Sequence, residues 1–242
     1  MIAAVTFDFW ETLVHDTPEN LERGRALRLE ALGALLARAG APQPAAALDD
    51  AYERSGTAMR ERFWARQRDA SIGEQVRLFL DCVGPGLAER LGPAGLAEAV
   101  EAYAAPVLRL PPLLNPGARE AVRELAGRGV RLGIVSNTGR TPGVVLRRVL
   151  ERYGLLRHFA AISYSDEVGF RKPHAAIFEL TLRALGARPA DAVHVGDNPL
   201  DDVEGARSFG MRAAHYAAGG RPAAAAADVI VTDLAELPLR LV

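Results

Sequence analysis

Short apolar segments and helical patterns succeed one another along the chain in a definite order. The first segment, Ile2 to Phe9, is apolar apart from Thr6 and Asp8 and has no helical stripe, so we predict a buried strand there. From about Thr17 to Leu110, leucine and alanine recur at helical spacing among charged residues, and no convincing strand interrupts them. We predict an all-helical insert in this region.

A proline-rich segment, Leu110 to Gly117, ends the helical region, because proline cannot continue a helix. Beyond it the pattern alternates strictly between helices and short strands, which predicts a parallel sheet covered by helices on both faces. The fold class is therefore α/β, with a Rossmann-like core. We expect helices at about 118–126, 143–153, 175–185 and 202–209, and strands at about 131–135, 160–164, 192–195, 212–215 and 228–231.

The composition restricts the partners and the compartment. The 242 residues carry a formal net charge of -1, so no overall positive field favours nucleic acid or an anionic membrane. No segment reaches the roughly 20 apolar residues of a membrane span, and the first residues do not resemble a signal peptide. The lone Cys82 cannot form an intrachain disulfide. We therefore expect a cytoplasmic protein.

The predicted strands end in polar motifs. The first ends in Asp8, a later one in Ser136-Asn137-Thr138, and another in Gly196-Asp197, with Asp201 and Asp202 close behind. Lys172, which precedes the helix at about 175–185, is the only lysine of the chain. Because ligands bind beyond the carboxyl ends of parallel strands, we expect these groups to meet at one edge of the sheet.

Taken together, these motifs resemble the haloacid dehalogenase superfamily, whose members mostly hydrolyse phosphate esters through an aspartyl-phosphate. The resemblance covers residues 1–16 and 112–242 as a three-layer catalytic core, and it implies that residues 17–111 form a mobile helical cap. It also implies a small phosphorylated substrate and Mg²⁺ as the cofactor, since a cation must screen the approach of a phosphate dianion to a carboxylate. We expect a monomer or a homodimer.

The same resemblance assigns a role to each motif. Asp8 would attack phosphorus as the nucleophile, and Lys172 would neutralise charge as the transition state forms. Thr12 would support the loop after the nucleophile. The implied residues are Asp8, Thr12, Ser136 and Lys172 for catalysis; Ser136, Asn137, Thr138 and Lys172 for substrate binding; and Asp8, the backbone carbonyl of Trp10, Asp197 and Asp202 for the metal.

Several of these residues have simpler interpretations. Asp202 could be the N-cap of the helix that follows it, Ser136 could also be a cap, and Lys172 could be a solvated surface residue. Thr12 is as compatible with a structural role as with a catalytic one. The arginines around Trp64 are typical of a solvated helix face.

Trp10 departs from the resemblance. Phosphatases of the superfamily carry a second aspartate two positions after the nucleophile, which acts as general acid and base, and an indole cannot replace it. Three functions remain open. They are a phosphatase whose leaving group needs no proton or in which Glu11 or a cap residue supplies it, a 2-haloacid dehalogenase, and a binding or regulatory protein on a weakened enzyme fold. The acidic cluster ranks the phosphatase first, because halide displacement requires no metal.

Overall fold

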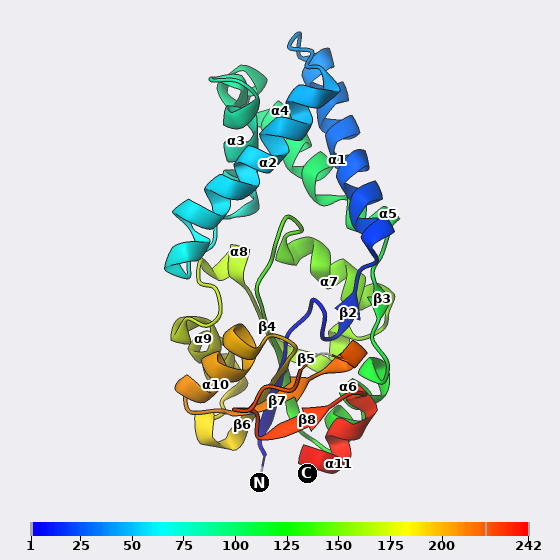
Figure 1. Ribbon diagram of the computed structural model, residues 1–242, viewed down its shortest axis with the longest axis vertical. Helices are drawn as coiled ribbons and strands as arrows, with labels where there is room; N and C mark the ends of the chain where they lie inside the picture. The colour runs from blue at the N-terminus through cyan, green and yellow to red at the C-terminus, as the bar shows by residue number, and fades with distance from the viewer. Residues whose placement is uncertain (1, 221, 242) are drawn as a thin grey trace.

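The protein has two parts that follow one another along its long axis (Figure 1). The computed structural model describes residues 2–220 and 222–241. One part is a sheet with helices on both faces and contains both chain ends, and the other consists of helices alone. The predicted α/β fold is confirmed. None of the helices in the described part of the chain is both long enough and apolar enough to cross a membrane.

The sheet has six strands in the order β5-β4-β1-β6-β7-β8, and all neighbouring strands run parallel. Phe7 at the end of β1 pairs with Ile134 of β4 and Val195 of β6. The carboxyl ends of these three central strands therefore lie level at one edge, as the motif positions require. The strands are β1 (Ala4–Phe7), β4 (Arg131–Ser136), β5 (Phe159–Tyr164), β6 (Ala192–Gly196), β7 (Arg212–Tyr216) and β8 (Val229–Val231).

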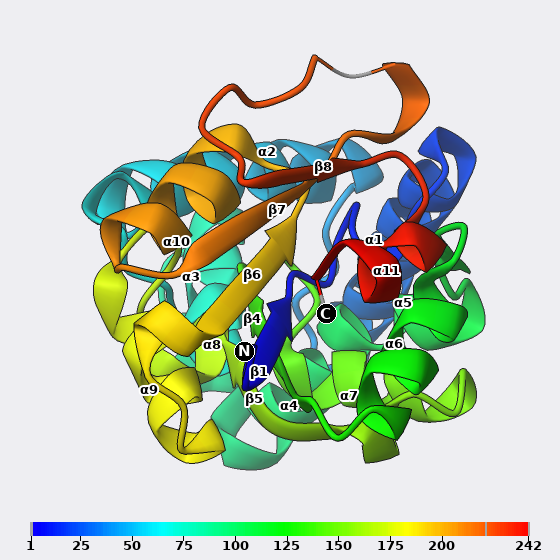
Figure 2. The same ribbon diagram turned by 90° about the horizontal axis from the view of Figure 1, so that it is seen from below.

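Alternate residues of the strands pack into separate cores on the two faces. Val5 and Phe7 belong to a large cluster with apolar residues of α6 and α7, whereas Ala4 belongs to a cluster with those of α9 and α10. This follows from the two-residue period of a strand, and Figure 2 shows helices on either side of the sheet. The helices of this part are α6 (Ala118–Gly127), α7 (Gly143–Arg152), α8 (Ser165–Val168), α9 (Ala175–Leu185), α10 (Gly205–Ser208) and α11 (Leu237–Leu241).

One predicted helix differs from the structure in a way that matters for the site. The helix expected at about 202–209 begins earlier, as a π-helical turn at Pro199–Glu204, and only its last part is α10. The side chain of Asn198 caps this turn by accepting hydrogen bonds from the amides of Leu200 and Asp201. Asp202 is therefore not the helix cap, and its carboxylate is available for other contacts.

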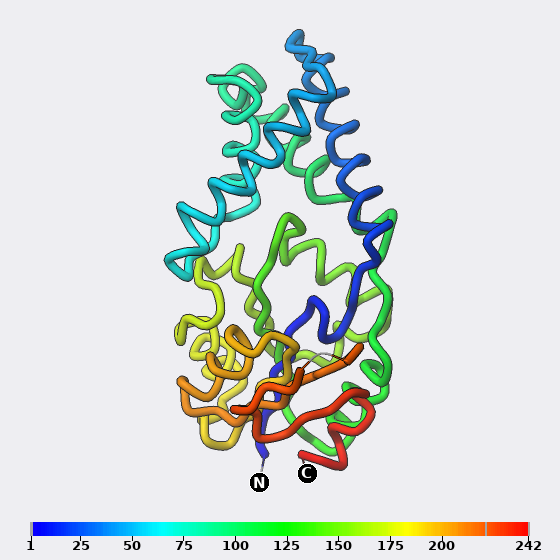
Figure 3. The backbone as a smooth tube through the Cα atoms, viewed as in Figure 1, coloured from blue at the N-terminus to red at the C-terminus, as the bar shows by residue number. Residues whose placement is uncertain are grey.

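The helical part has its own apolar core. Leu32, Leu36, Phe79, Leu80 and Tyr103 are buried together inside it. The trace in Figure 3 shows the long first helix leaving the sheet and the later helices returning to it. Side-chain caps mark the starts of two of these helices, Thr17 at α1 and the capping box of Ser71 and Glu74 at α3. The helices are α1 (Pro18–Arg38), α2 (Ala45–Arg62), α3 (Ile72–Val83), α4 (Leu87–Ala104) and α5 (Pro106–Arg109).

The chain passes between the two parts through two adjacent short strands. β2 (Val14–His15) pairs antiparallel with β3 (Leu113–Leu114), which lies inside the proline-rich segment predicted as a boundary. Asn115 fixes this crossing, because its amide group donates to the carbonyl oxygen of Thr12 at 2.8 Å and its Oδ1 is 2.8 Å from Nδ1 of His15. The helical insert therefore begins and ends at neighbouring points.

Candidate active site

Asp8 lies immediately after β1, at the centre of the sheet edge. Its backbone amide donates to the carbonyl oxygen of Val195 at 2.8 Å, which continues the strand register to the end of β6. The side chain is 11% exposed. Burial raises the pKa of the Asp8 carboxyl, while the positive charge of Lys172 opposes this rise. A buried carboxylate beside a cation has lost most of its hydration and suits a nucleophile.

Lys172 is buried rather than solvated, so its interpretation as a surface residue is wrong. Its ammonium nitrogen lies 2.8 Å from Oδ1 of Asp8 and 2.5 Å from Oδ1 of Asp202. Burial disfavours its charge, but the two carboxylates outweigh that effect and raise the pKa of Lys172 above its ordinary value. The chain's only lysine is therefore a cation held between two acids at the sheet edge.

Asp202 is 1% exposed and fully engaged by the protein. Its Oδ2 accepts a hydrogen bond from the amide of Asn198 at 2.9 Å, and its Oδ1 is shared by Lys172 and by Nε2 of His194 at 3.0 Å. Burial alone would raise its pKa, but Lys172 and His194 hold the pKa of Asp202 well below its usual range. These contacts therefore favour the ionised form of Asp202.

His194 on β6 is a member of this network that the sequence analysis missed. Burial lowers its pKa, and its Nδ1 lies 2.9 Å from the hydroxyl of Thr6. Because ionised Asp202 can only accept, the neutral ring donates from Nε2 and accepts the Thr6 hydroxyl at Nδ1. The available signal was its position in β6, two residues before Gly196, where the alternating pattern makes it face the same side as that glycine.

Three acidic side chains come together at the same edge. Asp8, Asp197 and Asp202 each offer a carboxylate oxygen, and these atoms all lie within 4.8 Å of one another. Oxygen ligands at such spacing fit a hard divalent cation such as Mg²⁺. Gly196 permits this arrangement, since a Cβ atom there would lie 2.1 Å from Cγ of Asp202. Both oxygens of Asp202 already bind protein groups, which favours Asp8 and Asp197 as the direct ligands.

The loop after β4 lies against the nucleophile. The hydroxyl of Ser136 accepts a hydrogen bond from the amide of Phe9 at 3.4 Å. Asn137 binds both backbone groups of Lys172, accepting from its amide at 2.7 Å and donating to its carbonyl oxygen at 3.1 Å. Ser136 is thus next to the nucleophile loop, and Asn137 holds the segment that carries the lysine.

Thr138 faces away from this centre. Its amide donates to the hydroxyl of Ser165 at 2.8 Å, and that hydroxyl in turn donates to Asp69 of the helical part at 2.6 Å. Asp69 also accepts from Arg171 at 2.8 Å and from the indole of Trp64 at 3.0 Å. These contacts, including that of Trp64, form a buried connection between the two parts of the protein.

Trp10 and Glu11 leave the sheet edge and line a cavity of about 610 Å³. The indole of Trp10 packs edge-on against Phe9 at 5.1 Å between ring centroids. Glu11 has a φ of 57°, an uncommon conformation for a residue other than glycine. Thr12 is fully buried, and its carbonyl oxygen accepts from Asn115, so the observed contacts of Thr12 support the loop.

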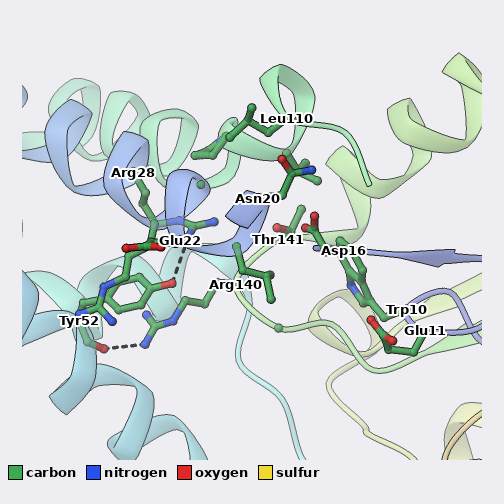
Figure 4. Close-up of a pocket in the computed structure, with 16 residues that line it drawn as sticks. Trp10, Glu11, Asp16, Asn20, Glu22, Arg28, Tyr52, Leu110, Arg140 and Thr141 are labelled. Carbon is green, nitrogen blue, oxygen red and sulfur yellow. Dashed lines mark hydrogen bonds between the residues drawn. The ribbon is translucent and has the colours of Figure 1, made fainter. Parts of the chain in front are cut away.

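The cavity lies between the two parts of the protein. Figure 4 shows Trp10 and Glu11 on one side and Arg28, Tyr52 and Arg140 on the other. Its walls come from the loop after β1, from α1, α2 and α5, and from the loop after β4. Asp8 itself is not a lining residue, but Trp10, two positions after it, is one. The cavity therefore brings side chains of the helical part close to the loop that follows the nucleophile.

Comparisons with known proteins agree with this geometry. The profile of the haloacid dehalogenase-like hydrolase family matches residues 2–210. A phosphoserine phosphatase from Thermus thermophilus is 33% identical over 244 residues, which cover 95% of each chain. A glyceraldehyde 3-phosphate phosphatase from Methanothermobacter thermautotrophicus is 37% identical over 100 residues, covering 40% of this chain and 42% of that one.

Solved structures give the same fold with both chemistries. A 2-haloacid dehalogenase from Pseudomonas syringae superposes with a TM-score of 0.75 at 26% identity, over 100% of this chain and 98% of that one. A HAD phosphatase from Thermococcus onnurineus superposes with a TM-score of 0.63 at 27% identity and the same coverage. The protein therefore belongs to the haloacid dehalogenase-like hydrolases and is a hydrolase.

Proposed function

We propose that the protein is a Mg²⁺-dependent phosphatase that hydrolyses a small phosphorylated metabolite through an aspartyl-phosphate on Asp8. The observation that supports this most is the cluster of Asp8, Asp197 and Asp202 around one point. A phosphate dianion is repelled by a carboxylate nucleophile, and a cation at such a cluster removes that repulsion. When a halide is displaced from a 2-haloacid, no phosphate dianion approaches the carboxylate, so that reaction does not require a metal-binding cluster.

The side chains divide the reaction between them. A carboxylate oxygen of Asp8 attacks phosphorus while the bond to the ester oxygen breaks, and water then attacks the same phosphorus and releases phosphate from Asp8. Lys172 balances the charge that develops on the phosphoryl oxygens, and Ser136 donates a hydrogen bond to them. Asp202 and Asn137 position Lys172 through the contacts described above. Bound Mg²⁺ would be held by Asp8, Asp197 and the carbonyl oxygen of Trp10, and would supply positive charge.

The proton for the leaving group is the open step, because Trp10 cannot supply it. Glu11 is the nearest candidate along the chain, and its side chain lines the cavity next to Trp10. We infer that residues 17–111 act as a cap that closes over this cavity and excludes water.

A 2-haloacid dehalogenase is the second candidate. Two observations favour it: the aromatic residue at position 10 and the structural similarity to the Pseudomonas syringae enzyme. A halide leaves without a proton, so Trp10 would be no handicap in that reaction.

The test compares the two reactions in one preparation. We expect hydrolysis of para-nitrophenyl phosphate that depends on Mg²⁺, and no halide release from 2-chloropropionate. Asp8→Asn should abolish hydrolysis while leaving the fold intact, whereas the control Asp191→Asn, an aspartate paired with exposed Arg188, should behave as the parent. Near-normal turnover by folded Asp8→Asn would refute the covalent mechanism, and halide release without phosphate hydrolysis would reverse the ranking of the two enzymes.

A further inference from the structure

The cavity between the two parts of the protein, which Trp10 and Glu11 line just after Asp8 in the chain, contains two guanidinium groups that have no carboxylate partner. Arg28 of α1 is only 6% exposed and donates to the carbonyl oxygen of Tyr103 at 2.6 Å and to the hydroxyl of Tyr52 at 3.1 Å. Arg140, from the loop after β4, donates to the Ser55 hydroxyl at 3.2 Å, the Tyr103 hydroxyl at 2.5 Å and the Tyr52 carbonyl oxygen at 2.6 Å. All these acceptors are uncharged.

The two groups share the same aromatic surroundings. The guanidinium of Arg140 stacks 3.6 Å above the centre of the Tyr52 ring, and that of Arg28 lies 5.9 Å from the same centre. Gly56 makes room for this, because a Cβ atom there would lie 2.6 Å from Nη2 of Arg140. Two positive charges held close together in a partly desolvated site repel each other. The aromatic faces offset only part of this electrostatic repulsion.

Arg25 is an arginine of the same cavity whose charge is neutralised by carboxylates. It lines the same wall, but its guanidinium contacts Asp49 at 3.0 Å and Glu53 at 2.5 Å. No described carboxylate lies within ion-pair distance of Arg28 or Arg140. Of the three arginines that line the cavity, only Arg25 has a carboxylate partner. Glu11, Asp16 and Glu22 also line the cavity, but none of them forms an ion pair with Arg28 or Arg140.

We propose that Arg28 and Arg140 form a subsite that binds a carboxylate of the substrate, so that the physiological substrate is a phosphorylated carboxylic acid. Its phosphoryl group reacts at Asp8, and its carboxylate lies between the two guanidinium groups, whose planar donors match it. The assignment rests on the proposed function for the phosphoryl half of the substrate only. The end of β4 and the loop after it would then contact both ends of the substrate, with Ser136 at the phosphoryl group and Arg140 at the carboxylate.

The experiment measures how strongly a carboxylate improves binding. Mg²⁺-dependent hydrolysis of para-nitrophenyl phosphate, which carries no carboxylate, gives the basal activity. Inhibition constants and calorimetric affinities are measured for phosphooxy carboxylic acids of two to five carbons, for ethyl phosphate and for propanediol 1,3-bisphosphate. A charge-assisted contact corresponds to about 10- to 100-fold in affinity, so we expect the best acid to bind at least about 10-fold more tightly than ethyl phosphate.

Matched variants test whether Arg28 and Arg140 cause the preference for phosphorylated acids over ethyl phosphate. Arg28→Gln and Arg140→Gln should reduce the preference to near unity, while Arg25→Gln should keep it. Gly56→Ala should fold, since alanine favours the helix, and should weaken the preference severalfold by displacing Arg140. A purely structural role of the arginines would lower the melting temperature and the affinity for all esters alike.

Each outcome decides the matter. A parent without the preference, or folded Arg28→Gln and Gly56→Ala proteins that retain it, would overturn the subsite. Tighter arginine-dependent binding of the bisphosphate than of any acid would overturn the carboxylate assignment. If no phosphate ester is hydrolysed but calorimetry shows arginine-dependent binding of the acids, the phosphatase reaction fails and the subsite stands.

Discussion

Replacing Lys172 by methionine tests the electrostatics of the site most directly. The side chain of Lys172 is 2% exposed, and its ammonium nitrogen lies within 2.8 Å of two buried carboxylates, those of Asp8 and Asp202. Methionine keeps most of the volume and removes the charge. Breaking a buried ion pair from one side costs about 3–5 kcal/mol, because the remaining charge is left uncompensated. At about 2–4 °C per kcal/mol for a chain of this size, the melting temperature should fall by about 6–20 °C.

Two further measurements identify the cause of that loss. Without Lys172 the pKa of each carboxyl should rise in the folded state above its unfolded value. A raised carboxyl pKa gives stability that is present at low pH and is lost as the pH rises, so the variant should recover stability on acidification. Mg²⁺ should also raise its melting temperature more than that of the parent, because the cation replaces the missing charge.

A thermal-melting series at several pH values, with and without Mg²⁺, provides the assay. Arg188→Met is the control, since it removes a cation from a solvent-exposed pair with Asp191 and should leave the melting temperature unchanged. If Lys172→Met melts like the parent, or shows no greater response to acid and Mg²⁺, then the three groups are not the coupled charge cluster inferred here.

Three other predictions address the metal, the leaving group and pH. Mg²⁺ should raise the melting temperature of the parent, and Asp197→Ala should remove most of that shift; a scan without any Mg²⁺ response would favour the metal-free dehalogenase. The slope of log(kcat/KM) against leaving-group pKa should be steep for the parent and flatter for Trp10→Asp, since a positioned acid contributes typically about 10²–10⁴-fold; a flat parent slope would mean that another group supplies the proton, with Glu11 as the first candidate. Burial raises the pKa of Asp166 from 3.8 to about 6, so the unfolding free energy should fall as the pH rises through that interval, and Asp166→Asn should abolish this dependence in chemical denaturation.

Much of the sheet could be predicted because parallel strands buried on both faces are short and uniformly apolar. The segments expected at 131–135 and 192–195 became Arg131–Ser136 and Ala192–Gly196, and the edge that collects Asp8 and Lys172 follows from that topology. The start of the last predicted helix was missed because Asn198 competes with Asp202 as a cap, and both residue types suit that position.

The contacts between the two parts could not be predicted from the pattern. Asp69 and Arg140 each look like ordinary polar residues of a helix or loop, and their partners in the other part of the protein lie 37 to 102 positions away, such as Tyr103 for Arg140 and Arg171 for Asp69. Helical periodicity reports which side of a helix is apolar, but not which arginine lacks a counter-charge. That information depends on the docking of the helices over the sheet.

The single buried lysine allows the opening of the active site to be measured by chemical labelling. Reagents that acylate amines require an accessible, unprotonated amino group, and the one ε-amino group in the chain belongs to a side chain that is 2% exposed and held between two carboxylates. Acylation of the ε-amino group, read by mass spectrometry, therefore requires the site to open and the lysine to leave its partners. A slow labelling rate in the native protein, faster after denaturation and slower still with a bound ligand, would measure the frequency of that opening without any engineered label.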